Sequence, residues 1–214
     1  ADKAIVVFGA RQTGKTTLLE HLFQDRKVKW LSGDEPQDRE LLTSLSSKAD
    51  ISILLSGLDV LVIDEAQRIQ GIGMLKRLED SKPSCRIFAT GSSSLELAGG
   101  VMESAAGRLW PMTLFPLSVS ELADHNSWLD VMESLPIRLT VGSYPEIVTH
   151  PQRSKATLRY LFERIVFKDL FAIAGIRRSE QFLHLVRRLA ANIGNLCSFS
   201  SLGQQCGLSS PTVE

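Results

Sequence analysis

The stretch that most constrains this chain is AIVVFGARQTGKTTLL at residues 4–19. The apolar run at residues 4–8 has the pattern of a buried strand, and the residues after Thr16 favour a helix. Between them stands G-x-x-x-x-G-K-[ST], the spacing of a loop whose backbone N–H groups surround phosphate oxygens. Gly9 and Gly14 let the backbone approach the phosphates, because a Cβ would interfere there. A glycine-rich turn that matches by chance is the alternative, and the flanking strand and helix disfavour it.

We expect this loop to hold the phosphates of ATP together with Mg²⁺. Lys15 would reach the β- and γ-phosphates, and the Thr16 hydroxyl would be a ligand of Mg²⁺. The loop N–H groups and the positive end of the following helix favour an anion at the same place. The predicted nucleotide-binding residues are Gly9, Ala10, Arg11, Gln12, Thr13, Gly14, Lys15, Thr16 and Thr17.

A second stretch supplies two carboxylates. Residues 59–63 have the pattern of a buried strand, and Asp64 and Glu65 follow at its carboxyl end, the edge where ligands bind in parallel α/β sheets. Asp64 is suited to bind Mg²⁺ opposite Thr16, directly or through water. Glu65 is suited to orient or deprotonate the attacking water, which favours hydrolysis of ATP over binding alone. A solvated strand end is the alternative, and the preceding phosphate loop disfavours it.

Three further polar residues are catalytic candidates with open alternatives. Thr90 ends a strand predicted at residues 86–90 and Ser92 follows it, where hydroxyls would reach the γ-phosphate or the attacking water. The alternative is that Ser92 or Ser93 caps the next helix. Arg108, at a strand entrance, is either an arginine finger toward its own or a neighbouring subunit, or part of a surface salt bridge. The predicted catalytic residues are Glu65, Lys15, Arg108, Thr90 and Ser92.

The apolar patterning predicts an α/β fold, a three-layer sandwich with a largely parallel sheet. Short apolar runs alternate with stretches of helical periodicity, and the run at 50–57 fits either a helix or a strand. In the first helix, Leu18, Leu19, Leu22 and Phe23 are expected to face the core. Strands are predicted at residues 4–8, 28–32, 59–63, 86–90 and 109–115, and helices at 16–24, 37–46 and 71–80.

Three parts are predicted: a P-loop ATPase domain at 1–125, a linker with cover elements at 126–150, and a C-terminal helical module at 151–214. The module would begin with a long helix at 152–174. Residues 199–213 have the pattern of a helix, a glycine turn and a helix start. This is the spacing of a helix-turn-helix, whose second helix can enter a DNA major groove, although many such units only pack against protein.

Charge is unevenly spread although the net charge is zero. Residues 1–150 contain 15 Lys and Arg against 20 Asp and Glu, a net −5, whereas residues 151–214 contain 9 against 4, a net +5. This asymmetry fits DNA binding by the C-terminal module, and it equally fits two parts of opposite charge that dock together.

The composition, 43% hydrophobic and 22% charged residues, is that of a soluble globular protein. No run approaches the ~20 apolar residues that span a bilayer, so no membrane partner is expected. Cys85, Cys197 and Cys206 lack metal-ligand spacing and indicate reduced thiols in a cytoplasmic protein.

Taken together, these stretches resemble a prokaryotic family of AAA-like P-loop ATPases with a C-terminal uncharacterised domain that contains a winged helix. The resemblance implies an ASCE-type sheet in the order 5-1-4-3-2, with ATP and Mg²⁺ as ligands. It also implies that Lys15 and Thr16 belong to Walker A and that Asp64 and Glu65 belong to Walker B. Members carry an N-terminal lead-in and a longer C-terminal domain, so we expect this chain to be truncated at both ends. The matching pieces are GARQTGKTTLL (9–19), WLSGDEP (30–36), LVIDEAQRI (61–69), ATGSSSLEL (89–97), AGRLWPMTLFPLS (106–118), GSYPEIV (142–148) and FKDLFAI (167–173).

The expected function is a Mg²⁺-dependent ATPase that couples nucleotide state to its C-terminal helical module, with a homo-oligomer as a further expectation. The alternative is a nucleotide-dependent DNA-binding regulator in which hydrolysis is slow or incidental. A kinase for a small substrate is a third class, and the acidic pair beside the water site disfavours it.

Overall fold

The computed structural model describes residues 3–69, 72–81, 83–91, 107–164 and 179–213. By its internal contacts the chain divides into two compact units, Ala1–Arg159 and Tyr160–Glu214, and each is described by itself. Across these described residues, no helix combines the length and the apolar character needed to cross a membrane.

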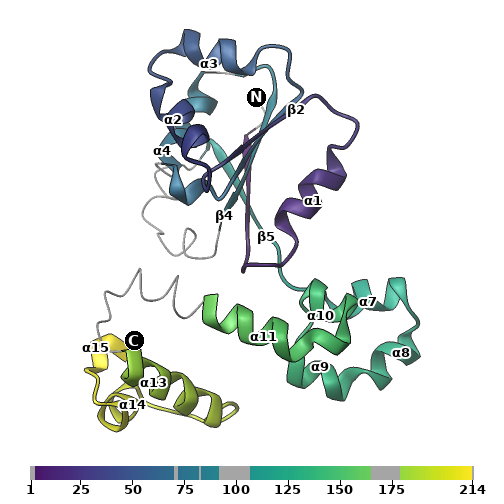
Figure 1. The fold of residues 1–214 in the computed structure, drawn as a ribbon, viewed down its shortest axis with the longest axis vertical. Coiled ribbons are helices and arrows are strands. Elements are labelled where there is room, and N and C mark those ends of the chain that lie inside the picture. Colours follow the sequence, from purple (N-terminus) through teal and green to yellow (C-terminus); the bar gives the residue numbers. More distant parts are fainter. Residues whose placement is uncertain (1–2, 70–71, 82, 92–106, 165–178, 214) are drawn as a thin grey trace. The chain divides into compact units, whose positions relative to one another are not determined.

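The first unit is built on a five-stranded sheet (Figure 1), and the strand order is β2-β3-β4-β1-β5. Every neighbouring pair is parallel, so all five carboxyl ends lie at one edge. The predicted α/β class, the parallel sheet and the order 5-1-4-3-2 are therefore confirmed. The strands are β1 (Ala4–Phe8), β2 (Val28–Ser32), β3 (Val60–Asp64), β4 (Arg86–Gly91) and β5 (Leu109–Thr113).

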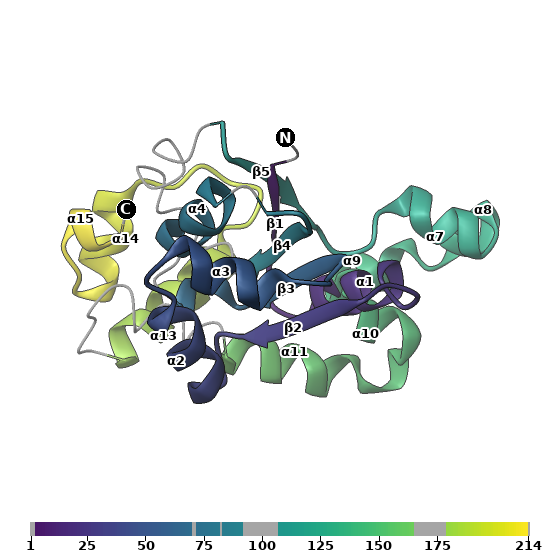
Figure 2. The same ribbon diagram turned by 90° about the horizontal axis from the view of Figure 1, so that it is seen from above.

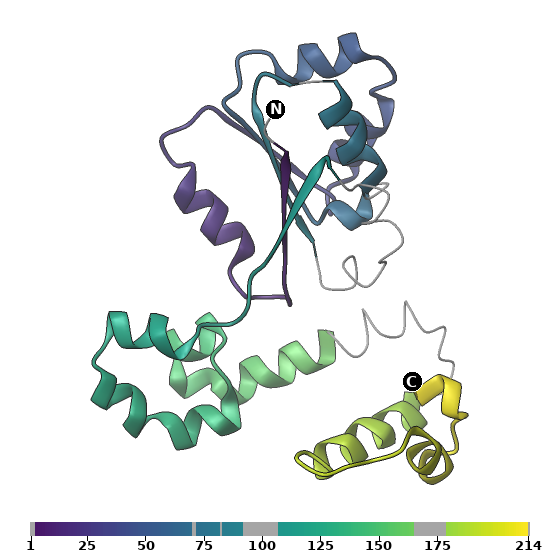
Figure 3. The same ribbon diagram turned by 180° about the vertical axis from the view of Figure 1, so that it is seen from behind.

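Helices cover both faces of this sheet and make the three layers (Figure 3). Because side chains alternate along a strand, Val6 and Val7 of β1 enter two separate cores. Val6 belongs to the larger core, which includes Leu75, and Val7 belongs to the smaller one with Leu19. The helices are α1 (Lys15–Leu22), α2 (Pro36–Ser44), α3 (Lys48–Leu55) and α4 (Ile72–Asp80), with a 3₁₀ turn, η1 (Ala66–Arg68).

The first helix buries fewer leucines than the sequence predicts. Leu19 is 1% exposed, whereas Leu18 and Leu22 are 40% and 58% exposed. Phe23, four residues after Leu19, lies on the same side and contacts Phe88, with ring centroids 4.7 Å apart. Leu18 and Leu22 lie about 100° around the helix axis from that stripe. The prediction that they face the core is wrong, because α1 covers the sheet through one narrow stripe.

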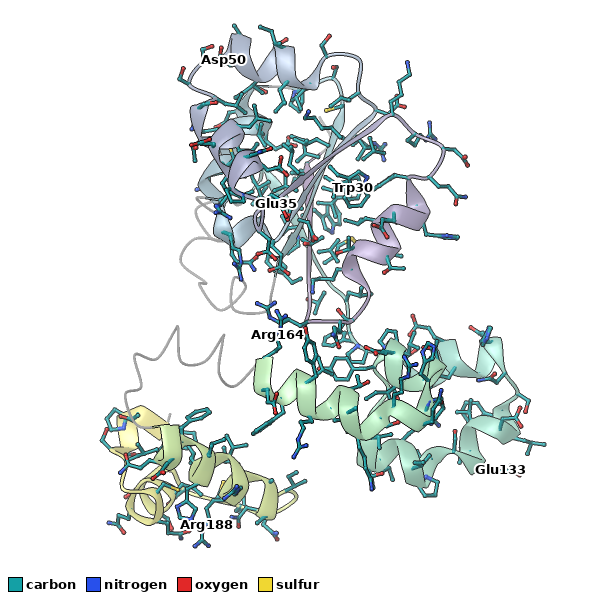
Figure 4. All side chains as sticks on the ribbon, in the orientation of Figure 1. Trp30, Glu35, Asp50, Glu133, Arg164 and Arg188 are labelled. Atoms are coloured by element: carbon teal, nitrogen blue, oxygen red, sulfur yellow. The ribbon has the colours of Figure 1, made fainter. Side chains whose placement is uncertain are left out.

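The ambiguous run at residues 50–57 is mostly helical and belongs to α3. A capping box fixes the start of this helix, where Asp50 is labelled in Figure 4. The Asp50 N–H donates to Ser47 Oγ at 3.1 Å, and the Ser47 N–H donates to Asp50 Oδ2 at 2.9 Å. These hydrogen bonds hold the pKa of Asp50 below its usual value, the backbone bond from Ser47 contributing most.

After β5 the first unit continues as a run of short helices. Ser118 begins this run, because its hydroxyl accepts the Glu121 N–H and caps α7. Helices α7 and α8 lie side by side (Figure 2). The elements are α7 (Val119–His125), α8 (Trp128–Glu133), α9 (Leu135–Val141), α10 (Pro145–Thr149), η2 (Pro151–Arg153) and α11 (Ser154–Glu163). Residues 165–174 of the long helix predicted at 152–174 lie outside the described residues.

The second unit begins at Tyr160, within α11, and contains α13 (Ser179–Ala191), α14 (Phe199–Cys206) and α15 (Ser210–Val213). Its small core joins Leu185 of α13 to Leu202 and Cys206 of α14. Gly207 ends α14 with a φ of 67°, a left-handed conformation that favours glycine. The predicted helix, glycine turn and helix start are confirmed. The winged helix is not, since the described residues of this unit (160–164 and 179–213) contain no strand.

Candidate functional site

The glycine-rich loop between β1 and α1 is shaped by two glycines. Gly14 has a φ of 93°, which a side chain rarely adopts. A Cβ on Gly9 would lie 2.3 Å from the backbone oxygen of Leu114, so the strand end leaves no room for a side chain. Within the predicted nucleotide-binding set, Thr13 and Lys15 are buried, whereas Thr17 is exposed. The loop therefore has the tight conformation that a phosphate cradle requires.

Lys15 is held inside this loop by backbone carbonyls. Its Nζ donates to the oxygens of Gly9 at 2.9 Å and Ala10 at 2.8 Å. Burial lowers the pKa of the Lys15 ammonium, and the negative charges of Glu65 and Asp64 oppose that shift. The loop thus concentrates a partly desolvated positive charge beside two carboxylates.

The two predicted metal ligands meet at the carboxyl edge of the sheet. The Thr16 hydroxyl lies 3.3 Å from Asp64 Oδ1 and 3.2 Å from Asp64 Oδ2, and donates to this carboxylate. Thr16 follows β1 and Asp64 ends β3, with β4 between these strands. A hydroxyl and a carboxylate are the oxygen ligands that Mg²⁺ prefers, so the pair fits that metal.

Thr90 connects the two acidic residues. It is fully buried at the end of β4. Its hydroxyl donates to Asp64 Oδ1 and accepts the backbone N–H of Glu65 at 3.1 Å. Both hydrogen-bonding roles of the hydroxyl are thereby used to fix the end of β3. Ser92, the other residue predicted at this strand end, lies outside the described residues.

Glu65 is oriented by a neighbour that the sequence analysis did not single out. Its backbone is left-handed, with a φ of 51°. The amide of Gln67 in η1 donates from Nε2 to Glu65 Oε2, and Gln67 Oε1 is buried without a hydrogen-bond partner. The position of Gln67 two residues after Glu65 gave no sign of this contact, because the contact depends on the turn after β3.

Gly33, at the end of β2, also supports the acidic pair and was missed. Its N–H donates to the backbone oxygen of Asp64 at 2.8 Å. A Cβ at this position would lie 2.3 Å from the backbone oxygen of Glu65. The carboxyl end of β2 therefore packs closely against the turn that carries Asp64 and Glu65.

Replacing Gly33 by Ala is expected to displace this turn, because a backbone oxygen 2.3 Å from the new methyl group cannot yield as a side chain would. We expect a loss of about 1–3 kcal/mol in the free energy of unfolding, measured by urea denaturation, together with weaker nucleotide binding. Gly73→Ala is the matched control, because that glycine lies in α4 with open space around it. Equal stability of the two variants would contradict the tight fit of Gly33.

Pro145, at the start of α10, is the third residue that the sequence analysis missed. Its Cγ lies 4.0 Å from the position of a Cβ built on Gly14. The loop before α10 is hydrogen-bonded to the segment that follows β5. The Leu117 N–H donates to the backbone oxygen of Ser143 at 2.9 Å. The start of α10 therefore lies close to the glycine-rich loop.

Arg108 is not brought to this site. It precedes β5, whose first residue, Leu109, pairs with Ala4 at the amino edge of the sheet, opposite the glycine-rich loop. Its Nε donates to Asp80 Oδ1 at 2.6 Å, with the two side chains 45% and 52% exposed. The structure favours the surface salt bridge over a role in the chain's own site. A role toward a neighbouring subunit stays a prediction.

The fold and the loop define a nucleotide-binding protein of the P-loop class. The AAA domain family matches residues 1–123, more than half of the chain, and the chain belongs to this family. A domain of unknown function, DUF8612, matches residues 132–214. No curated protein matches the chain.

Two solved structures are similar to the chain at low identity. One is a signal transduction ATPase with numerous domains (STAND) that has a tetratricopeptide repeat sensor, from Pyrococcus horikoshii. It is 13% identical with a TM-score of 0.46, and the match covers 88% of this chain and 32% of that one. The other is the Drosophila origin recognition complex (ORC) bound to DNA, 14% identical with a TM-score of 0.39, covering 98% and 59%. The chain thus spans less than two thirds of the length of either protein.

Proposed function

We propose that the chain is a Mg²⁺-dependent ATPase that couples nucleotide state to its C-terminal helical module. The observation that carries the proposal is the convergence of Thr16, Asp64 and Thr90 at one strand edge beside Lys15. A hydroxyl, a carboxylate and a buried ammonium at the mouth of a phosphate loop are the groups that phosphoryl transfer from ATP requires.

Each side chain has a proposed task. Lys15 would exchange carbonyl oxygens for the β- and γ-phosphate oxygens, which compete well for a charged donor. Thr16 and Asp64 would hold Mg²⁺, which supplies positive charge against the phosphates when bound. Glu65, held by Gln67, would orient a water molecule and accept its proton. Thr90 would keep Asp64 and Glu65 in register with the loop.

The proposed organisation is a P-loop domain at 1–125, a linker with cover elements at 126–150 and a helical module at 151–214. A homo-oligomer, in which Arg108 would serve a neighbouring subunit, belongs to the same proposal. The cytoplasm is the proposed location, on the strength of three free cysteines that suit a reducing compartment.

The test is steady-state phosphate release from ATP by the chain with Mg²⁺ and with excess EDTA. We expect release at a rate typical of slow ATPases with Mg²⁺ and none above background with EDTA. Tight ATP binding without release under both conditions would reduce the function to nucleotide binding.

Thr16→Ala tests the metal-binding task. Loss of the hydroxyl removes one proposed oxygen ligand, so we expect the Mg²⁺ concentration for half-maximal turnover to rise about 10- to 100-fold. A magnesium titration of phosphate release measures this shift. Thr43→Ala is the matched control, since the Thr43 hydroxyl only donates to carbonyls one turn earlier in α2. An unchanged magnesium requirement in Thr16→Ala would remove Thr16 from the metal site.

A second candidate function is a nucleotide-dependent DNA-binding regulator. The arrangement of α14, Gly207 and α15 supports it, together with the net +5 charge of residues 151–214. Its test is a gel shift with duplex DNA at several salt concentrations. Binding that weakens steeply with salt would support it, since each neutralised phosphate releases a counterion. No shift at low salt would exclude it for this chain.

A further inference from the structure

The run of short helices after the sheet lines an open cavity of about 310 Å³. All of its lining residues belong to the first unit, and none of them belongs to the phosphate loop. Its walls are mainly aliphatic, and four of the lining side chains come from α7, α8, α9 and α10: Leu122, Val131, Val141 and Ile147. An apolar cavity of this size that also has a few polar groups is the usual form of a small-molecule site.

Arg138 is the cation among the residues that line this cavity. Its Nη2 donates to the backbone oxygen of Val131, but its Nε is buried with no hydrogen-bond partner. Few buried donors in folded proteins lack a partner, because the lost hydration is not replaced. Arg138 therefore has an unused hydrogen-bonding group beside an apolar space.

One carboxylate, that of Asp130, also lines the cavity, and it already accepts hydrogen bonds at the start of α8. Asp130 Oδ2 accepts the Ser127 N–H at 3.2 Å and the Ser127 hydroxyl at 2.7 Å, as part of the cap of α8. No ion pair joins Asp130 to Arg138 among the described residues. The lining charges of Arg138 and Asp130 cancel, so the cavity has no excess positive charge for a polyphosphate, and Arg138 is the lining group that can pair with one anionic group.

We propose that this cavity binds a small free carboxylate with a short aliphatic body. The body would lie against Leu122, Val131 and Ile147, and the carboxylate would accept hydrogen bonds from the Arg138 guanidinium. Because Nε is buried, the guanidinium has to turn toward the cavity when the ligand binds. This rotation of the guanidinium would let Nε donate to the ligand carboxylate, the partner that it lacks in the free protein. The site is separate from the proposed ATPase chemistry and does not depend on it.

The experiment compares hexanoate with hexanamide, which has the same carbon chain but no charge. Isothermal titration calorimetry on the full chain without nucleotide measures both affinities. We expect hexanoate to bind at least about tenfold more tightly than hexanamide, as a charged hydrogen bond to Arg138 predicts. Equal affinities, or no heat from hexanoate at millimolar concentrations, would overturn the proposal.

Two variants and one control distinguish the contribution of the Arg138 charge from that of the cavity space. Arg138→Gln is expected to bring the hexanoate to hexanamide ratio close to one. Val141→Phe is expected to abolish binding of both probes by filling the space, while Leu139→Phe, on the exposed side of α9, leaves binding unchanged. Hexanoate binding that survives Val141→Phe, or a ratio that survives Arg138→Gln, would place the ligand elsewhere. If Arg138→Gln does not fold, the pair Val141→Phe and Leu139→Phe still decides between these outcomes.

Discussion

Replacing Glu65 by Gln is expected to reduce the rate of ATP hydrolysis by about 100- to 10,000-fold while ATP binding is retained. Glutamine keeps the shape of the side chain and can still accept the hydrogen bond from Gln67 Nε2. It cannot accept a proton from water at neutral pH, so only the chemical step loses its base. Phosphate release under multiple turnover measures the rate, and calorimetric titration with ATP measures the binding.

Glu133→Gln is the matched control, because Glu133 is an exposed side chain of α8 (Figure 4). We expect it to hydrolyse ATP at the rate of the unmodified chain. If Glu65→Gln also turned over at that rate, Glu65 would not be the base. The base would then have to be found elsewhere, and the geometry around Gln67 would be structural.

The second large effect is expected from Lys15→Met, which should weaken ATP binding by about 100-fold or more. Lys15 is the proposed cation for the β- and γ-phosphates, and one hydrogen bond from a charged donor contributes about 1.5–3 kcal/mol. Methionine retains most of the volume and removes the charge. Competition between ATP and a fluorescent ATP analogue measures the change.

The fold is expected to survive this substitution. Burial lowers the pKa of Lys15, so the folded state favours the neutral form more than the unfolded state does, and the charge reduces stability in full at pH values below the folded pKa. That cost disappears as the pH rises toward the ordinary lysine value, and Lys15→Met should lack this pH dependence. Lys48→Met, at an exposed position in α3, controls for the loss of any lysine. Normal ATP affinity in Lys15→Met would remove the loop from the proposed site.

The sheet and the phosphate loop could be predicted from sequence because each depends on local patterns. Apolar runs mark the strands, and the spacing from Gly9 to Thr16 requires both a tight loop and a following helix. The meeting of Thr16 with Asp64 was predictable as well. Parallel strands bring their carboxyl ends to one edge, so the ends of β1 and β3 come close whatever the loops between them do.

The supporting residues could not be predicted, since their roles depend on contacts between distant segments. Gly33 has an ordinary turn sequence, and its importance appears only where β2 meets the turn after β3. The sequence around Pro145 is typical of a helix start, and it gives no sign that this residue lies close to Gly14 in the fold. For Arg108 the sequence left an arginine finger and a surface salt bridge open, because only the pairing of β1 with β5 shows that the residue lies at the edge of the sheet opposite the chain's own phosphate loop.

Pro145 lies close to Gly14, since a Cβ added to that glycine would be 4.0 Å from the Pro145 Cγ, and this closeness has a thermodynamic consequence for the first unit. A phosphate loop that changes conformation around a bound nucleotide changes the space next to the first residue of α10. If ATP binding shifts α10 toward one position, then fixing α10 in that position raises the affinity for ATP. By thermodynamic reciprocity, the two effects have the same factor.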